Sequence, residues 1–113
     1  MLIVLLDEPG LFVFASPDDA VRQIEPIHAE SEIRVAFDDS AVPYEVEWVR
    51  PNRHRRSLFG LLRSIEPGQY RFVPAGPADP TSLIELLETH PDHTNPHEAK
   101  ADLDSLLVRL RAV

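Results

Sequence analysis

The feature that most constrains this chain is the recurrence of large apolar residues at every second position in two segments between residues 32 and 48. Apolar side chains occupy every second position of residues 33–37 and again of residues 44–48. A period of two residues is typical of β-strands with one buried face. Asp38-Asp39-Ser40 supplies turn chemistry between the two segments. The pattern predicts a hairpin with an apolar face and a charged face. The apolar face comprises Ile33, Val35, Phe37, Tyr44, Val46 and Trp48, and the charged face carries Glu32, Glu45 and Glu47.

The N-terminal segment predicts a second hairpin followed by a short helix. Apolar residues 2–6 and 11–14 are separated by Pro9-Gly10, which suits the centre of a tight turn. Ser16-Pro17-Asp18-Asp19 then reads as a helix start, with Ser16 as the cap. Pro26 disfavours helical backbone at the residue before it, so we expect the helix to end there.

The C-terminal third predicts two helices. One begins at Asp79-Pro80 and the other at Asn95-Pro96, and both continue with leucines at helical spacing. The polar linker of residues 89–94 contains a proline, so we expect a helical hairpin. Before the first of these helices, a Pro67-Gly68 turn precedes a predicted strand in which the apolar residues Tyr70 and Phe72 alternate with polar ones. Residues 57–65 fit either a helix face or a strand.

These elements predict a single α+β domain over residues 1–113. We expect an antiparallel sheet of about five strands, with a short N-terminal helix and a C-terminal helical hairpin packed on one face. The other face would then carry the outward carboxylates. Residues 1–6 are too short for a membrane span and lack the features of a signal peptide. The chain has no cysteine, and the cytoplasm is the expected compartment.

The charge of the chain is unevenly distributed. The formal net charge is -8, and residues 1–49 hold 11 of the 19 acidic side chains but only two basic ones. An acidic surface repels phosphates and anionic membranes, and it accelerates encounter with basic partners. We therefore expect the N-terminal half to bind a basic protein. The candidate binding residues are the carboxylates Asp18, Asp19, Glu30, Glu32, Asp38, Asp39, Glu45 and Glu47.

Residues 50–71 have the opposite character, with six arginines against one glutamate. A patch formed by Arg50, Arg53, Arg55 and Arg56 would suit phosphate or nucleic acid. The simpler interpretation is a solvated loop whose arginines pair with nearby carboxylates. The chain is acidic as a whole, and the run lacks the interleaved aromatic residues that stack on bases. Nucleic acid is therefore the alternative partner rather than the expected one.

No known catalytic motif is present, so we expect a binding protein rather than an enzyme. The histidines at positions 90, 93 and 97 lie close together in sequence, with Asp92 between them. Imidazole and carboxylate groups can hold zinc, but this set lacks the paired ligands on stiff turns that structural sites present. Solvent-exposed histidines are the simpler interpretation, and no metal or cofactor is expected.

Parts of the chain resemble small bacterial immunity proteins. The relevant stretches are Leu11-Phe12-Val13-Phe14-Ala15-Ser16-Pro17-Asp18-Asp19-Ala20, Ile24-Glu25-Pro26-Ile27, Gly68-Gln69-Tyr70-Arg71-Phe72-Val73-Pro74, Asp79-Pro80 and residues 83–87. These stretches are similar to the opening and general layout of immunity proteins that accompany polymorphic toxins, including those of contact-dependent growth inhibition systems. The resemblance covers about half of the chain in scattered pieces, and it transfers no functional residue.

The resemblance implies that the chain binds and neutralises a cognate toxin domain inside the cell. Toxins that cleave nucleic acid are commonly basic, and an acidic inhibitor would be steered toward such a surface. Such an inhibitor needs no catalytic residue. Tyr44 or Trp48 could add an aromatic anchor to the interface, although burial in the core is the competing interpretation for both.

Overall fold

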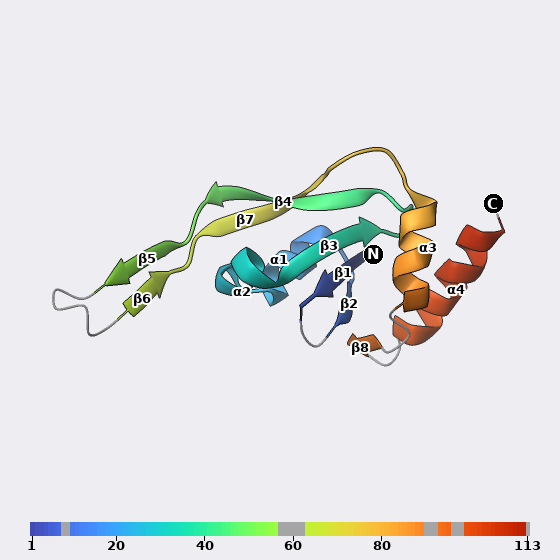
Figure 1. The fold of residues 1–113 in the computed structure, drawn as a ribbon, viewed down its shortest axis with the longest axis horizontal. Coiled ribbons are helices and arrows are strands. Elements are labelled where there is room, and N and C mark those ends of the chain that lie inside the picture. Colours follow the sequence, from blue (N-terminus) through green and yellow to red (C-terminus); the bar gives the residue numbers. More distant parts are fainter. Residues whose placement is uncertain (8–9, 57–62, 90–92, 96–98, 113) are drawn as a thin grey trace.

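The structure is a computed structural model that describes residues 1–7, 10–56, 63–89, 93–95 and 99–112 (Figure 1). It has the predicted α+β class, with four helices and eight strands in the described part of the chain. The elements are β1 (Leu2–Leu6), β2 (Leu11–Phe14), α1 (Pro17–Gln23), α2 (Pro26–Glu32), β3 (Ile33–Asp38), β4 (Pro43–Arg50), β5 (Arg53–Arg56), β6 (Arg63–Glu66), β7 (Gln69–Pro74), α3 (Pro80–Thr89), β8 (His93–Asn95) and α4 (Ala99–Arg111).

The main sheet has the strand order β7-β4-β3-β1-β2-β8. The five strands from β7 to β2 are paired antiparallel, which confirms the predicted sheet. The sixth strand, β8, pairs parallel with β2 at the edge. It lies in the linker between α3 and α4, where a polar and proline-containing sequence gave no strand signal.

Local sequence chemistry explains the start of α1. The Ser16 hydroxyl accepts a hydrogen bond from the Asp19 amide at 3.0 Å, and Pro17 occupies the first turn. The helix ends before Ile24, which has extended backbone. The chain then starts a second helix, α2, which the sequence pattern did not predict. Pro26 disfavours helical backbone at Glu25 and also suits the first turn of the next helix. Two extended residues, Ile24 and Glu25, therefore separate the two helices.

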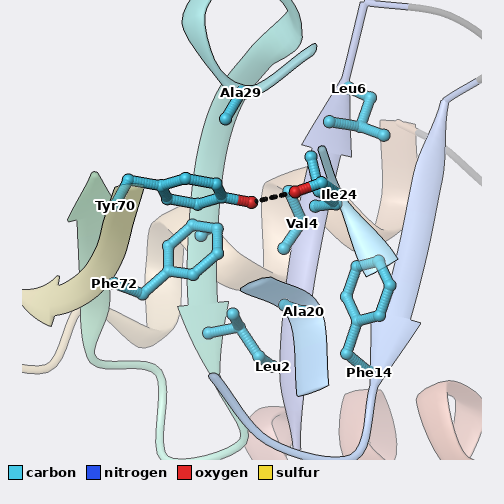
Figure 2. Packing of buried hydrophobic residues seen from close by; sticks show 10 residues of the cluster. Leu2, Val4, Leu6, Phe14, Ala20, Ile24, Ala29, Tyr70 and Phe72 are labelled. Atoms are coloured by element: carbon cyan, nitrogen blue, oxygen red, sulfur yellow. Dashed lines mark hydrogen bonds between the residues drawn. The ribbon is translucent and has the colours of Figure 1, made fainter. Parts of the chain in front are cut away.

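Helices cover both faces of the sheet, whereas we expected them on one. The helices α1 and α2 pack on the first face, over a core that includes Leu2, Val4, Phe14 and Phe72 (Figure 2). The helices α3 and α4 pack on the second face. The buried residues of the second core are Ile3, Leu11, Phe37, Ala41, Leu83, Leu86, Leu87, Leu103, Leu106 and Leu110. Consecutive side chains of β1 enter the first and the second core in turn. The continuous apolar run at the N-terminus is therefore that of a strand buried on both faces.

One buried hydrogen bond ties the edge strand β7 to the end of α1. The Tyr70 hydroxyl donates to the Ile24 carbonyl at 2.6 Å, and the ring is almost fully buried (Figure 2). Burial raises the pKa of Tyr70 to about 12 because the ionised phenolate would lose its hydration. The neutral hydroxyl is thereby kept as a donor where the backbone carbonyl needs one.

The register of the β3–β4 hairpin corrects the predicted faces. Phe37 pairs with Pro43, and Ala36 pairs with Tyr44. Val35 and Phe37 therefore lie on the α3–α4 face, while Tyr44, Val46 and Trp48 lie against the α1–α2 core. The prediction of one shared apolar face was wrong because the turn closes by a hydrogen bond from the Asp38 amide to the Val42 carbonyl, which sets the register.

A two-stranded arm made by β5 and β6 extends the β4–β7 pair away from the body (Figure 1). It makes the molecule elongated, with extents of 60 × 27 × 20 Å. The arginine run that we interpreted as a loop is thus partly a strand, and residues 63–66 of the ambiguous segment are also a strand. Residues 57–62 of that segment lie outside the described residues.

Asn52 fixes the base of the arm. Its amide group donates to the Pro26 carbonyl at 2.9 Å and to the Glu30 carboxylate at 2.6 Å. Its amide oxygen accepts from the backbone of Gly68 at 2.6 Å. One side chain therefore joins α2, the end of β4 and the start of β7.

The C-terminal helices form the predicted hairpin. Asp79 caps α3 by accepting hydrogen bonds from the Ser82 amide at 3.1 Å and the Ser82 hydroxyl at 2.6 Å. These bonds lower the pKa of Asp79. The first described residue of α4 is Ala99, and Pro96, where the sequence predicts this helix to begin, lies outside the described residues. None of the described helices has the length and apolar character that crossing a membrane requires.

Candidate functional site

The eight carboxylates predicted to bind a partner occupy three separate places. Asp38 and Asp39 lie in the β3–β4 turn, and Glu45 and Glu47 lie on the face of β4 away from α1 and α2. The remaining four lie on the N-terminal helices: Asp18, Asp19, Glu30 and Glu32. The structure therefore does not join the eight residues in a single acidic face.

The turn carboxylates have structural partners. The Asp38 side chain accepts hydrogen bonds from the amides of Ser40 at 2.9 Å and Val42 at 3.0 Å. Asp39 lies 3.6 Å from the N-terminal ammonium group, and its carbonyl accepts from Arg109 at 2.6 Å. The contacts of Asp38 close the β3–β4 turn, and the contact of Asp39 with Arg109 holds α4 against that turn. Both residues therefore have a structural role.

The outer face of β4 is mixed in charge rather than acidic. Glu47 lies opposite Arg71 and accepts from its Nε at 2.7 Å. Glu45 lies opposite Val73 and is exposed. Val49, on the same strand, has 59% of its surface exposed. This face offers a partner one paired carboxylate, one exposed carboxylate and scattered apolar surface.

The N-terminal helices concentrate negative charge. Residues 16–32, which we call the α1–α2 surface, carry five carboxylates and one arginine. The fifth carboxylate is Glu25, which the sequence analysis did not select. Glu30 accepts from Asn52 and lies 2.9 Å from Nε2 of His54, and these hydrogen bonds lower the pKa of Glu30. Glu30 therefore stays ionised at a lower pH than an isolated glutamate does.

An apolar pocket opens within this acidic surface. Its volume is about 250 Å³, and Leu6, Phe12, Phe14 and Ile24 provide its apolar lining. Figure 2 shows Leu6 and Phe14 on the opposite side of the core from Tyr70 and Phe72, with Ile24 between the two pairs. The remaining lining residues are polar or charged, namely Gln23, Glu25, His28 and Glu32. Ligand pockets for small molecules are commonly about 300–1,000 Å³, so this one is closer to the size of a single side chain.

The charged residues of the pocket form a row along α2. His28 lies between two carboxylates, with Nε2 at 3.9 Å from Glu25 and Nδ1 at 3.2 Å from Glu32. The spacing of three and four residues places all three on one side of the helix. Glu25 is 73% exposed and Glu32 is 36% exposed, so both carboxylates are accessible from solvent.

The apolar lining includes a pair of aromatic rings. Phe12 and Phe14 project from the same side of β2, with ring centroids 6.3 Å apart and planes inclined by 13°. Phe14 is buried, whereas Phe12 is half-buried and packs at the border of the core. The pocket thus combines an aromatic surface with two accessible carboxylates.

The base of the arm contains a second hollow of about 420 Å³, lined by Arg50, Pro51, Arg53, Glu66 and Pro67. Arg50 and Arg53 are exposed there. Their positive charge is offset in part by Glu66, which faces Arg53 across the β5–β6 pair. The side chains of Arg55 and Arg56, also named as phosphate-binding candidates, lie outside the described part of the structure.

A third hollow of about 350 Å³ lies between β3 and α3. Val35, Phe37 and Leu86 supply its apolar surface, and Ser82, Glu85 and Thr89 supply its polar surface. Among the described residues that line it, Glu85 is the only charged one, so the lining of this hollow is mostly uncharged.

The predicted aromatic anchors belong to the core. Trp48 lies against Tyr70, with ring centroids 5.4 Å apart, and Tyr44 packs against the same cluster. Both are half-buried. Their position on the α1–α2 side of β4 follows from the hairpin register and favours a packing role.

The histidine cluster falls largely outside the described residues. His90, Asp92 and His97 are not described, and His93 is described only as part of the backbone of β8. Among the residues whose positions are described, no group of three or more histidine, aspartate or glutamate side chains is arranged to hold a metal ion.

Comparison of the chain with protein-family models, curated proteins and solved structures gave no match.

Proposed function

We propose that this chain is an immunity-type inhibitor that binds a basic toxin domain in the cytoplasm through its α1–α2 surface. The observation that carries the proposal is the apolar pocket surrounded by an excess of carboxylates. This combination is what a protein needs to attract a basic partner and then hold it. No catalytic residue, metal or cofactor is required for this function.

The two parts of the surface have different physical roles. Exposed carboxylates accelerate encounter with a basic protein and disfavour acidic competitors. Interface affinity, in contrast, comes mostly from a few well-packed side chains that enter desolvated pockets. The α1–α2 surface supplies both, whereas on the outer face of β4 Glu47 is paired with Arg71 and Glu45 is exposed opposite Val73.

The resemblance to immunity proteins supports the same proposal. The matching stretches include residues 11–20 and 24–27, which build β2, α1 and the start of α2. A toxin domain that cleaves nucleic acid presents a basic active site to its substrate. An inhibitor with an acidic surface can cover such a site by using the same electrostatic attraction.

The arm supports one alternative function, binding of nucleic acid or phosphate. Its basis is the pair of exposed arginines, Arg50 and Arg53, beside the hollow at the arm base. Glu66 in that hollow and the net charge of -8 oppose it. A gel-shift experiment at low salt separates the functions, because phosphate contacts give binding that falls steeply as salt is added.

Hydrogen exchange on the complex tests the proposed interface. The partner is the C-terminal part of the protein encoded immediately upstream, purified together with this chain. We expect slower amide exchange in residues 11–14 and 16–32 on binding, because these segments would be covered. Residues 45–49 of β4 serve as the internal control and should exchange at the free rate. Protection confined to β4 or to the arm would contradict the proposed interface.

A further inference from the structure

We infer that the pocket between β2 and the N-terminal helices binds an arginine side chain presented by the partner. This inference rests on the proposed function and names the chemistry that its site selects. The pocket combines an aromatic wall, an apolar floor and two accessible carboxylates in a volume of about 250 Å³. Each of these properties matches a different part of an arginine side chain.

The lining favours a cation on an apolar stem. Leu6 and Ile24 can contact methylene groups, and burying such groups is favourable by the hydrophobic effect. Glu25 and Glu32 lie at the same pocket, on either side of His28 along α2. A purely apolar occupant would remove hydration from these carboxylates without replacing it, and an anionic occupant would be repelled.

Guanidinium fits this site better than ammonium. Its planar group can lie over an aromatic ring such as Phe12 while its N–H groups donate to a carboxylate. Paired N–H donation from one guanidinium to a carboxylate adds directional specificity that a lysine ammonium lacks. The stacked rings of Phe12 and Phe14 add aromatic surface to the same pocket as the carboxylates.

A small probe tests the pocket without the partner. N-acetyl-arginine N-methylamide would be titrated into isotopically labelled chain, and amide chemical shifts would be followed by NMR. We expect saturable shifts centred on Phe12, Ile24 and His28, with a dissociation constant in the millimolar range because one side chain makes few contacts. N-acetyl-citrulline N-methylamide, which has nearly the same shape without the charge, should cause much smaller shifts.

Two matched variants locate the binding. The double variant Glu25→Gln/Glu32→Gln should lose the arginine-specific shifts, whereas Glu45→Gln/Glu47→Gln should retain them. Dispersed amide spectra of both variants would establish that they are folded. Equal responses to the arginine and citrulline probes would overturn the inference, as would shifts confined to Arg50, Arg53 and their neighbours.

The outcome is separable from that of the proposed function. If the chain neutralises its partner but its pocket shows no preference for the arginine probe, the partner is held by other contacts and only the present inference fails. If the probe binds in the pocket but the upstream protein forms no complex, the arginine site stands and the partner assignment fails.

Discussion

Replacing Gly68 by alanine is expected to destabilise the chain by roughly 2–4 kcal/mol, a large fraction of the stability of a domain this size. A Cβ atom at this position would lie 2.1 Å from the Arg50 carbonyl oxygen and 2.6 Å from the Pro51 carbonyl carbon. Both are backbone atoms, so no side-chain rotation relieves the overlap. The strands must separate instead, which would also disturb the hydrogen bond from the Gly68 amide to Asn52.

Urea denaturation of the variant and the parent chain measures this effect. Gln69→Ala is the matched control because Gln69 follows Gly68 directly and its side chain is exposed at the start of β7. A surface substitution of this kind should change stability by about 0.5 kcal/mol or less. If Gly68→Ala proved as stable as Gln69→Ala, the close approach of the Arg50 and Pro51 backbone to Gly68 would be incorrect.

Charge reversal at the pocket is expected to have the largest effect on partner binding. The double variant Glu25→Lys/Glu32→Lys replaces both pocket carboxylates by cations beside His28. A basic partner would then meet like charges where it formerly met opposite ones. We expect affinity to fall by about 100-fold or more, because unfavourable charge pairs at an interface cost several kcal/mol. Isothermal titration against the purified partner measures the loss.

The matched control changes net charge by the same amount on the opposite face. Glu45→Lys/Glu47→Lys lies outside the α1–α2 surface and should weaken binding only through the general field of the protein. That weaker effect should vanish as salt is raised, because charges more than about 10 Å apart are screened at 0.1 M salt. Equal losses in the two variants would show that binding depends on net charge rather than on the pocket.

Local sequence signals predicted those elements whose structure is determined by neighbouring residues. Ser16 caps α1 and Asp79 caps α3 through contacts three residues away, so their chemistry is visible in the sequence. Alternation identified β4 and β7 because their more buried residues recur at every second position. It also identified β3, although Ala36 and Phe37 of that strand are both buried, one in each core. The α+β class and the five antiparallel strands followed from these elements.

Features set by tertiary contacts were not predictable in the same way. Alternation alone does not determine which face of β3 matches which face of β4, because that depends on the register set by the turn. The helix α2 follows α1 after two extended residues, Ile24 and Glu25, and no side-chain hydrogen bond caps its start. The arm is polar and arginine-rich, and its strands form by pairing with each other outside the core.

The candidate site was only partly predictable. Charge density drew attention to Glu32, which lines the pocket, but it did not select Glu25, which lines it too. The pocket combines Leu6 of β1 and Phe12 of β2 with residues around α2, and these come together only on folding. Sequence analysis could identify a capped and acidic helical segment, but not the apolar pocket beside it.

Growth rescue tests the central claim most directly. The C-terminal part of the protein encoded immediately upstream would be expressed in bacteria, with or without this chain. The account predicts that expression arrests growth and that co-expression of this chain restores it, whereas an equally abundant Glu25→Lys/Glu32→Lys variant does not. Arrested growth that persists with the unaltered chain would contradict the claim that it neutralises this partner.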